Sequence, residues 1–265
     1  MESISVNLGR EKDHVRIAVI GDSHIGDPHA DEQLLRDRVK YIKENSDMHV
    51  MLLGDLMNNA TKGGVSDVYG ENLTPMQSLQ RLVEIFDPIR NRIIVMTDGN
   101  HEARSYKEVG VDLTYILACE LGIKDRYIPD AALAFVTFGE LETGKKESNG
   151  SGLVRQMTYS IFASHGRGGG GTVGSKMNAL EKLASICDAD VYCHAHSHLP
   201  GVFKESFFRT DIRARKAMQV DKLFVNSNAY LNYGGYGKAS NFRPASLAMP
   251  VIWLSGTQRE MYGTA

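Results

Sequence analysis

The sequence predicts an α/β fold in which two packed β-sheets are flanked by helices. In the first half, short apolar runs rich in β-branched residues alternate with segments of helical periodicity, which is typical of βα units with parallel strands. In the second half, strand-like runs follow one another with one clear helix among them. The composition, 42% hydrophobic and 23% charged, is that of a globular protein that can bury a sizeable core.

The first half is expected to contain three strands, each followed by a helix. Asp31 is a possible N-cap of the first helix, Thr74 and Gln77 form a capping box at the start of the second, and Gly122 would end the third. In chain order the expected elements are a strand over 15–20, a helix over 31–45, a strand over 49–53, a helix from 74 that carries Ile89, a strand over 92–96 and a helix over about 111–121.

The second half is expected to build the second sheet. Its predicted strands cover 133–138, 157–163, 191–193, 223–226 and 251–254, and its helix covers about 175–187. The Gly/Ser-rich stretch 139–152 is typical of a turn or hairpin tip. We expect a single domain over 1–265, in which 199–265 supplies strands and loops that complete the second sheet and the rim of a cleft.

Charge and cysteine content exclude several classes of protein. Thirty Lys and Arg against 32 Asp and Glu give a net charge of -2, so any polyanion must be held by a local patch. Three cysteines without a CxxC pair argue against a disulfide framework and a structural zinc site. No secretory signal and no apolar run of about 18 residues is found, so we expect a cytoplasmic protein that does not enter a membrane.

Polar side chains follow five of the predicted strands. Ligands of α/β proteins collect at the carboxyl ends of strands, so these residues can meet in one cleft although they are far apart in sequence. Carboxylates, imidazoles and an amide suit Mn, Fe, Zn or Ni, and their number fits two divalent ions better than one. The residues are Asp22 and His24, Asp55, Asn100 and His101, His165, and the group His194, His196 and His198.

Five short motifs in this order resemble those of the calcineurin-like metallophosphoesterases: GDSH at 21–24, GDLMN at 54–58, GNHE at 99–102, SHG at 164–166 and AHSH at 195–198. The resemblance implies a four-layer α/β/β/α sandwich that binds two divalent ions, with Mn the favoured metal. It also implies hydrolysis of a phosphate ester by metal-activated water.

The resemblance assigns a role to each motif residue. Asp22, His24 and His198 would bind the first metal, and Asn100, His165 and His196 the second. Asp55 would bridge the two metals. His101 would stabilise the transition state or protonate the leaving oxygen.

Two features of the motifs leave alternatives open. Ala195 stands where the family usually has Gly, and His194 with His196 could also be read as the HxH pair, although we favour His196 with His198. The Gly-rich loop 166–176 has the wrong order for a Walker motif. It is either a flap from which Arg167 reaches a phosphate, or a turn leading to a helix capped by Ser175.

The predicted substrate contacts are Arg104, Arg167 and Asn58. Arg104 follows GNHE as in the phosphoprotein phosphatases, where an Arg contacts phosphate, whereas GDLMNNA lacks that branch's GDxVDRG pattern. The DxHIG opening resembles the DNA-repair exonuclease branch. Lys, Arg and Phe residues are interleaved over 203–222, so nucleic acid could bind to this stretch. A solvated connection is the commoner interpretation of such a stretch. We therefore favour a phosphodiesterase. The alternatives are a phosphomonoesterase acting on phosphoprotein or a nucleotide and, less favoured, a catalytically silent scaffold.

Overall fold

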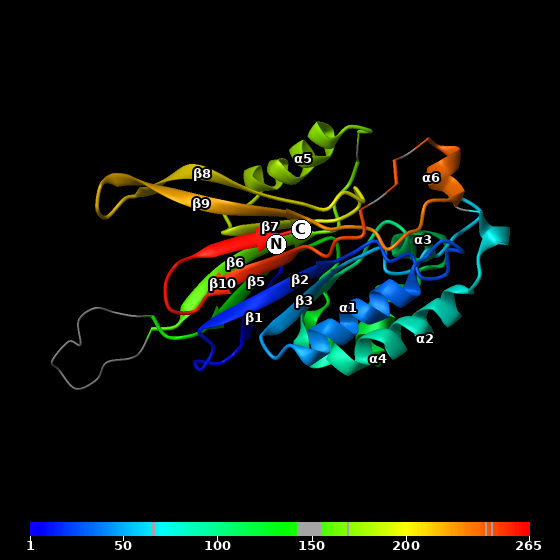
Figure 1. Ribbon diagram of the computed structural model, residues 1–265, viewed down its shortest axis with the longest axis horizontal. Helices are drawn as coiled ribbons and strands as arrows, with labels where there is room; N and C mark the ends of the chain where they lie inside the picture. Colours follow the sequence, from blue (N-terminus) through cyan, green and yellow to red (C-terminus); the bar gives the residue numbers. More distant parts are fainter. Residues whose placement is uncertain (65–66, 142–154, 169, 242, 245) are drawn as a thin grey trace.

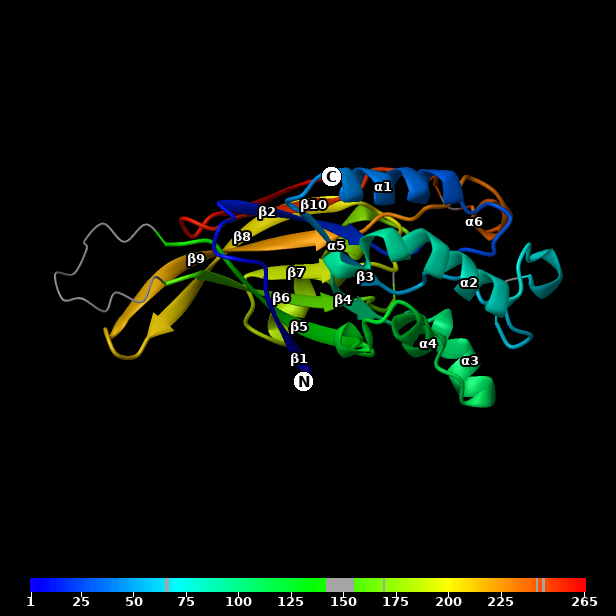
Figure 2. The ribbon, with the colours of Figure 1, turned by 90° about the horizontal axis from the view of Figure 1, so that it is seen from below.

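Two β-sheets lie face to face and form the centre of the molecule, with helices on their outer faces (Figure 1 and Figure 2). The computed structural model describes residues 1–64, 67–141, 155–168, 170–241, 243–244 and 246–265. Most of the predicted turn at 139–152 lies outside these residues. None of the helices within them is long and apolar enough to cross a membrane.

Among the described residues, the first sheet has five strands in the order β11-β10-β2-β3-β4. Its central strands are parallel, because each is joined to the next through a helix, and β10 joins them antiparallel to β2. The strands are β2 (His14–Ile20), β3 (Met48–Leu53), β4 (Ile93–Thr97), β10 (Val251–Ser255) and β11 (Met261–Thr264).

The outer face of this sheet is covered by the helices α1 (Glu32–Glu44), α2 (Pro75–Phe86) and α4 (Leu113–Glu120). Their buried apolar side chains form one core with the strands beneath them. Asp31 accepts the Leu34 N–H at the start of α1, and Thr74 with Gln77 forms the expected capping box of α2. The helical path changes to a 3₁₀ helix after Phe86, so Ile89 lies outside α2.

Within the part of the chain that the structure describes, the second sheet has six strands in the order β1-β5-β6-β7-β9-β8. The helix α5 (Val173–Glu181) packs on its outer face through Leu180, which contacts a cluster containing Phe162, Tyr192 and Phe224. The strands are β1 (Ser3–Asn7), β5 (Ala131–Phe138), β6 (Met157–Ser164), β7 (Val191–His194), β8 (Gly201–Asp211) and β9 (Lys216–Asn226).

The assignment of the C-terminal strands to the second sheet is partly wrong. β10 pairs with β2 in the first sheet, and β11 extends that sheet, while the N-terminal β1 pairs with β5 in the second. Strand apolarity does not encode which sheet a strand enters, because both sheets present an apolar inner face to the same core.

Other local expectations also need correction. β1, β8, β11 and the helix α3 (Glu102–Val109) were not expected. β1 and the outer part of β8 are largely exposed edge segments with no apolar run to reveal them. α5 is capped by Thr172 rather than Ser175, and a short 3₁₀ helix, Lys182–Ser185, follows it. A further short helix is α6 (Gly235–Ala239).

Candidate metal centre

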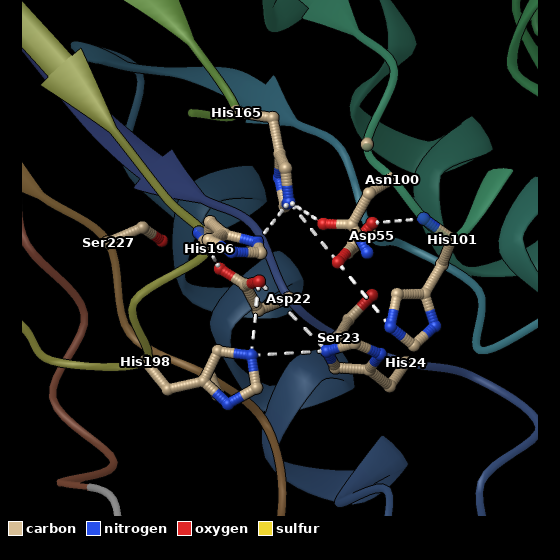
Figure 3. Close-up of polar contacts among 12 residues, drawn as sticks. Asp22, Ser23, His24, Asp55, Asn100, His101, His165, His196, His198 and Ser227 are labelled. Carbon is tan, nitrogen blue, oxygen red and sulfur yellow. Dashed lines mark hydrogen bonds and ion pairs between the residues drawn. The ribbon is translucent and has the colours of Figure 1, made fainter. Parts of the chain in front are cut away.

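The polar residues that follow the strands meet at one end of the molecule. The carboxyl ends of β2, β3, β4, β6 and β7 all reach this end, because these strands run in the same direction within their sheets. Figure 3 shows the resulting cluster, in which every residue assigned to a metal points toward the others. The expected convergence therefore occurs, while the role of each residue as a ligand stays a prediction.

Five of these residues have a left-handed backbone, which is uncommon outside glycine. The φ angles are 53° at Asp22, 46° at His24, 48° at Asp55, 61° at His196 and 51° at His198. Each such residue costs about 1–3 kcal/mol unless surrounding contacts compensate. Strain concentrated on one group of polar residues is typical of a functional site.

Backbone hydrogen bonds hold the five loops against one another. Asp22 N–H donates to Gly54 O at 3.0 Å, His24 N–H to Asp55 O at 3.0 Å, and Ala195 N–H to His165 O at 3.1 Å. The Gly99 Cα lies so close to Asp55 that a Cβ would overlap the backbone nitrogen and Oδ1 of Asp55. The motif glycine is thus required by the close approach of two loops.

Asp22, His24 and His198 form the first group of potential ligands. His198 Nε2 lies 3.2 Å from Asp22 Oδ1 and 3.2 Å from His24 Nε2, and His24 Nε2 lies 3.9 Å from the same carboxylate oxygen. The Asp22 and His24 side chains are buried, whereas 35% of the His198 side chain is exposed.

Asp55, His165 and His196 form the second group, and Asn100 adjoins it. His165 Nε2 lies at its centre, 3.2 Å from Asp55 Oδ2, 3.2 Å from His196 Nδ1 and 3.1 Å from Asn100 Oδ1. The opposite ring nitrogen, Nδ1, contacts Leu53 O at 2.7 Å. Since a carbonyl only accepts, Nδ1 carries the proton of the neutral ring, and Nε2 presents its lone pair to the group.

The donor set fits divalent metal ions. Atoms about 2.0–2.2 Å from a common ion lie about 3.0–3.4 Å apart, which matches most of the separations in the two groups. Among the described residues, the buried His24 Nδ1 has no hydrogen-bond partner, and the buried Asp22 Oδ1 faces the His198 imidazole rather than a backbone donor. A buried carboxylate oxygen with so little hydrogen bonding is costly, and a cation next to it would reduce that cost.

The ionisation of the groups also suits a cation. Burial raises the pKa of Asp55, but the neighbouring His165 outweighs this effect and holds the pKa far below its usual range. Burial lowers the pKa of His24, His101 and His196, assisted by nearby imidazoles at His24 and His196. Burial lowers the pKa of His165, but the Asp55 carboxylate outweighs this effect and raises that pKa to about 10, so a metal that binds His165 Nε2 would displace a proton. Charged carboxylates beside neutral imidazoles are the forms that bind metals.

His101 lies beside the cluster, with its ring edge-on to His24 at a centroid distance of 4.5 Å. Its Nδ1 contacts Asn58 O at 2.6 Å, so this nitrogen donates and Nε2 faces Asp55 Oδ2 at 3.8 Å. His24, Asp55 and His101 also form a group that could hold a metal. The geometry is therefore open both to the predicted proton-transfer role and to metal binding.

Glu102 organises the site, although sequence reasoning gave it no role. Its buried carboxylate accepts the backbone N–H groups of Asp55, Met57 and Gly99 at 2.9, 3.0 and 3.0 Å. Burial and the Asp55 carboxylate raise the pKa of Glu102 to about 7, while the Met57 N–H opposes the rise. Its place at the end of the GNHE motif was the signal that could have revealed it.

Glu102→Ala should destabilise the fold strongly, because it leaves three N–H groups without their acceptor. Each such group costs about 1–3 kcal/mol, so we expect a loss of at least about 3 kcal/mol and a fall in Tm of about 6–12 °C. Thermal unfolding followed by circular dichroism measures this. Glu108→Ala, on the exposed part of the same helix, is the control and should change Tm little. Equal Tm values for the two variants would refute the role of Glu102.

The structure leaves the predicted substrate contacts beside the cluster rather than within it. Asn58 is buried, and its amide donates to Asp27 and Glu71. Arg104 donates to the carbonyls of Asn58 and Asn59. The Arg167 side chain is 90% exposed and lies 3.5 Å from Asp130.

The choice between His194 and His196 can be followed in the contacts. His196 faces His165 within the second group, whereas the His194 ring lies between Gly166 and Asn226. Ala195 is buried and is not among the residues with positive φ, so its Cβ is accommodated without strain. These contacts favour His196 with His198 as the HxH pair.

The basic stretch 203–222 is a hairpin of β8 and β9 rather than a connection. Lys222 is buried against Asp188 and the Tyr192 hydroxyl, and Arg209 also pairs with Asp188. Phe203 stacks on Phe224 in the sheet. Part of the charge and aromatic surface predicted for nucleic acid is therefore used by the fold.

A family model described as calcineurin-like phosphoesterase matches residues 15–200. No curated protein matches the chain. Similar solved structures include a conserved uncharacterized protein from Streptococcus pneumoniae that is described as a predicted phosphoesterase. It is 11% identical, the match covers 95% of this chain and 98% of that chain, and the TM-score is 0.37. GAP50, the anchor in the inner membrane complex of Plasmodium, has 11% identity, coverage of 92% and 82%, and a TM-score of 0.41. A Vps29 double mutant from Entamoeba histolytica has 13% identity, coverage of 95% and 100%, and a TM-score of 0.31. Likenesses at such low TM-scores do not bear on the activity of this chain.

Proposed function

Because the chain belongs to the calcineurin-like phosphoesterase family, we propose that it is a phosphoesterase that uses two divalent metal ions, with a phosphodiester as its substrate. The observation that carries this proposal is the pair of adjacent ligand groups, each built from several strand ends. A protein that kept this fold only as a scaffold would have no need to maintain strained backbone at five of these residues.

Asp22, His24 and His198 would hold one ion, Asn100, His165 and His196 the other, and Asp55 both. When bound, two such ions would polarise the phosphoryl oxygens and lower the pKa of an attacking water. Asp55 Oδ1 accepts the His101 N–H at 2.8 Å, which fixes the carboxylate so that Oδ2 faces His165. Because Nδ1 donates to Asn58 O, Nε2 of the neutral His101 ring is unprotonated, so Nε2 would take up a proton from solvent and pass it to the leaving oxygen while Nδ1 stays anchored.

The hairpin bears on the size of the diester. β8 has 11 residues, so its far end lies about 35 Å along the sheet from its start near the cluster. In Figure 2 the arrowheads of β6, β7 and β9 point to one end of the molecule, and the turn of the hairpin lies at the opposite end. The exposed Arg213, Arg215 and Lys216 belong to that far end. These basic residues therefore offer no phosphate contacts close to the cluster, so the hairpin gives no support for nucleic acid as the substrate, and we propose a small diester.

The test is hydrolysis of bis-p-nitrophenyl phosphate and p-nitrophenyl phosphate with Mn²⁺, in parallel with labelled single- and double-stranded DNA. We expect a higher kcat/KM for the diester and no cleavage of DNA. A preference for the monoester would favour a phosphomonoesterase and overturn the substrate class. Absence of all hydrolysis in a protein that binds Mn²⁺ would overturn the proposed activity and favour the scaffold.

A further inference from the structure

A buried amide lies behind the loop that carries His196 and His198. Asn226, the last residue of β9, is fully buried and contacts three groups of this segment. His194 Nδ1 lies 2.8 Å from Asn226 Oδ1, and Asn226 Nδ2 lies 2.5 Å from both Ser197 Oγ and Leu199 O. Asn226 and its three partners are not members of either ligand group.

The chemistry of the partners fixes the orientation of the amide. Leu199 O only accepts, so the NH₂ group of Asn226 faces it, and Oδ1 therefore faces His194. His194 Nδ1 donates to Oδ1, which places the other ring nitrogen against Gly166, where a Cβ would overlap it. The three contacts together require one acceptor, facing His194, and two N–H donors, facing Ser197 and Leu199. The planar amide of an asparagine supplies them, whereas the carboxylate of an aspartate has no donor.

Two of the three contacts flank His198 in the sequence. Ser197 precedes it and Leu199 follows it, so the Asn226 amide holds both flanks of a residue whose φ is 51°. A residue in this strained conformation persists only where its surroundings determine it.

The His198 ring lacks the anchor that holds the His165 ring. The His165 ring is anchored by its Nδ1 on Leu53 O, whereas no described residue forms a hydrogen bond with His198 Nδ1. The His198 side chain is also the most exposed of the first group. Its position is therefore set through the backbone rather than through the ring.

We infer that Asn226 is a positioning residue, which sets the affinity of the first metal site by holding the backbone on both sides of His198, with His194 as its third contact. The inference rests on the proposed function, because it assumes that His198 binds a metal. His196 has separate support, since its N–H donates to Asp22 Oδ2 at 2.9 Å and Ala195 N–H donates to His165 O. The second site should consequently be less affected.

The test is a calorimetric titration of metal-free protein with Mn²⁺, comparing wild type with Asn226→Asp. This variant keeps the shape of the side chain but replaces the donor to Leu199 O by a carboxylate oxygen. We expect two sites in both proteins, with the affinity of one of them about 10- to 100-fold lower in the variant, as found when groups supporting a ligand are changed. The other site should keep its affinity within a small factor.

Tyr159→Phe is the matched control for a general loss of stability. The buried Tyr159 hydroxyl contacts the carbonyls of Ser255, Gln258 and Glu260, far from the ligand loop along β6. This variant should lower Tm without changing Mn²⁺ affinity. Should Asn226→Asp fail to fold, Ser197→Ala removes one contact only and should weaken the same site to a smaller extent.

Three results would overturn the inference and leave the proposed function standing. They are wild-type Mn²⁺ affinity at both sites in folded Asn226→Asp, an equal loss of affinity at both sites, and the same loss of affinity in Tyr159→Phe. A wild-type protein that binds no Mn²⁺ would overturn the two together.

Discussion

Asp55→Asn is expected to abolish phosphoesterase activity and to reduce the bound metal from two ions per chain to at most one. An asparagine can still accept the backbone N–H of His101 at Oδ1, so the loop that carries residue 55 should keep its path. The amide then takes the place of Oδ2, which lies 3.2 Å from His165 Nε2, and the negative charge between the two groups is lost. Removing one preorganised electrostatic contact alone costs about 10²–10³ in kcat, so we expect a loss of at least about 10³-fold.

Steady-state hydrolysis of the diester and elemental analysis of the purified protein measure the two effects. The control is Asp87→Asn, which changes an exposed carboxylate paired with Arg90 and should retain both activity and metal. Equal metal content and equal turnover in Asp55→Asn and wild type would refute the bridging role.

His101→Asn should lower kcat about 10²- to 10⁴-fold while both metal ions remain bound. The shorter amide can keep the contact that His101 Nδ1 makes with Asn58 O, but it has no group at the position of Nε2. Transition-state stabilisation or proton transfer to the leaving oxygen would be lost, whereas the predicted ligands are untouched.

Metal content decides between the two roles that the geometry allows for His101. His24, Asp55 and His101 are close enough to share an ion, so a metal-binding role predicts that His101→Asn loses metal in parallel with activity. Rate loss with two ions retained supports the proton-transfer role. Loss of one ion would contradict it.

The sequence could predict the convergence of the site because each motif follows a strand, and parallel strands bring their carboxyl ends together. The helices α1 and α2 were predictable for a local reason, since each N-cap side chain bonds to a backbone N–H only three residues further along the chain. The choice of the HxH pair stayed open because His194 and His196 have the same spacing along the chain as His196 and His198.

The groups that support the cluster could not be predicted in this way. Asn226 is 32 positions from His194, and Glu102 accepts the N–H of Asp55 across 47 positions, so neither contact has a local signature. The pairing of β10 with β2 in the first sheet and of β1 with β5 in the second has the same origin, because pairing partners are chosen by the whole fold rather than by a strand's own residues.

Anomalous diffraction from crystals of the protein grown with Mn²⁺ would show whether two ions occupy the cluster. Two peaks are predicted, one among Asp22, His24 and His198, the other among Asn100, His165 and His196, with Asp55 in contact with both. A single peak, or peaks away from these side chains, would contradict the account.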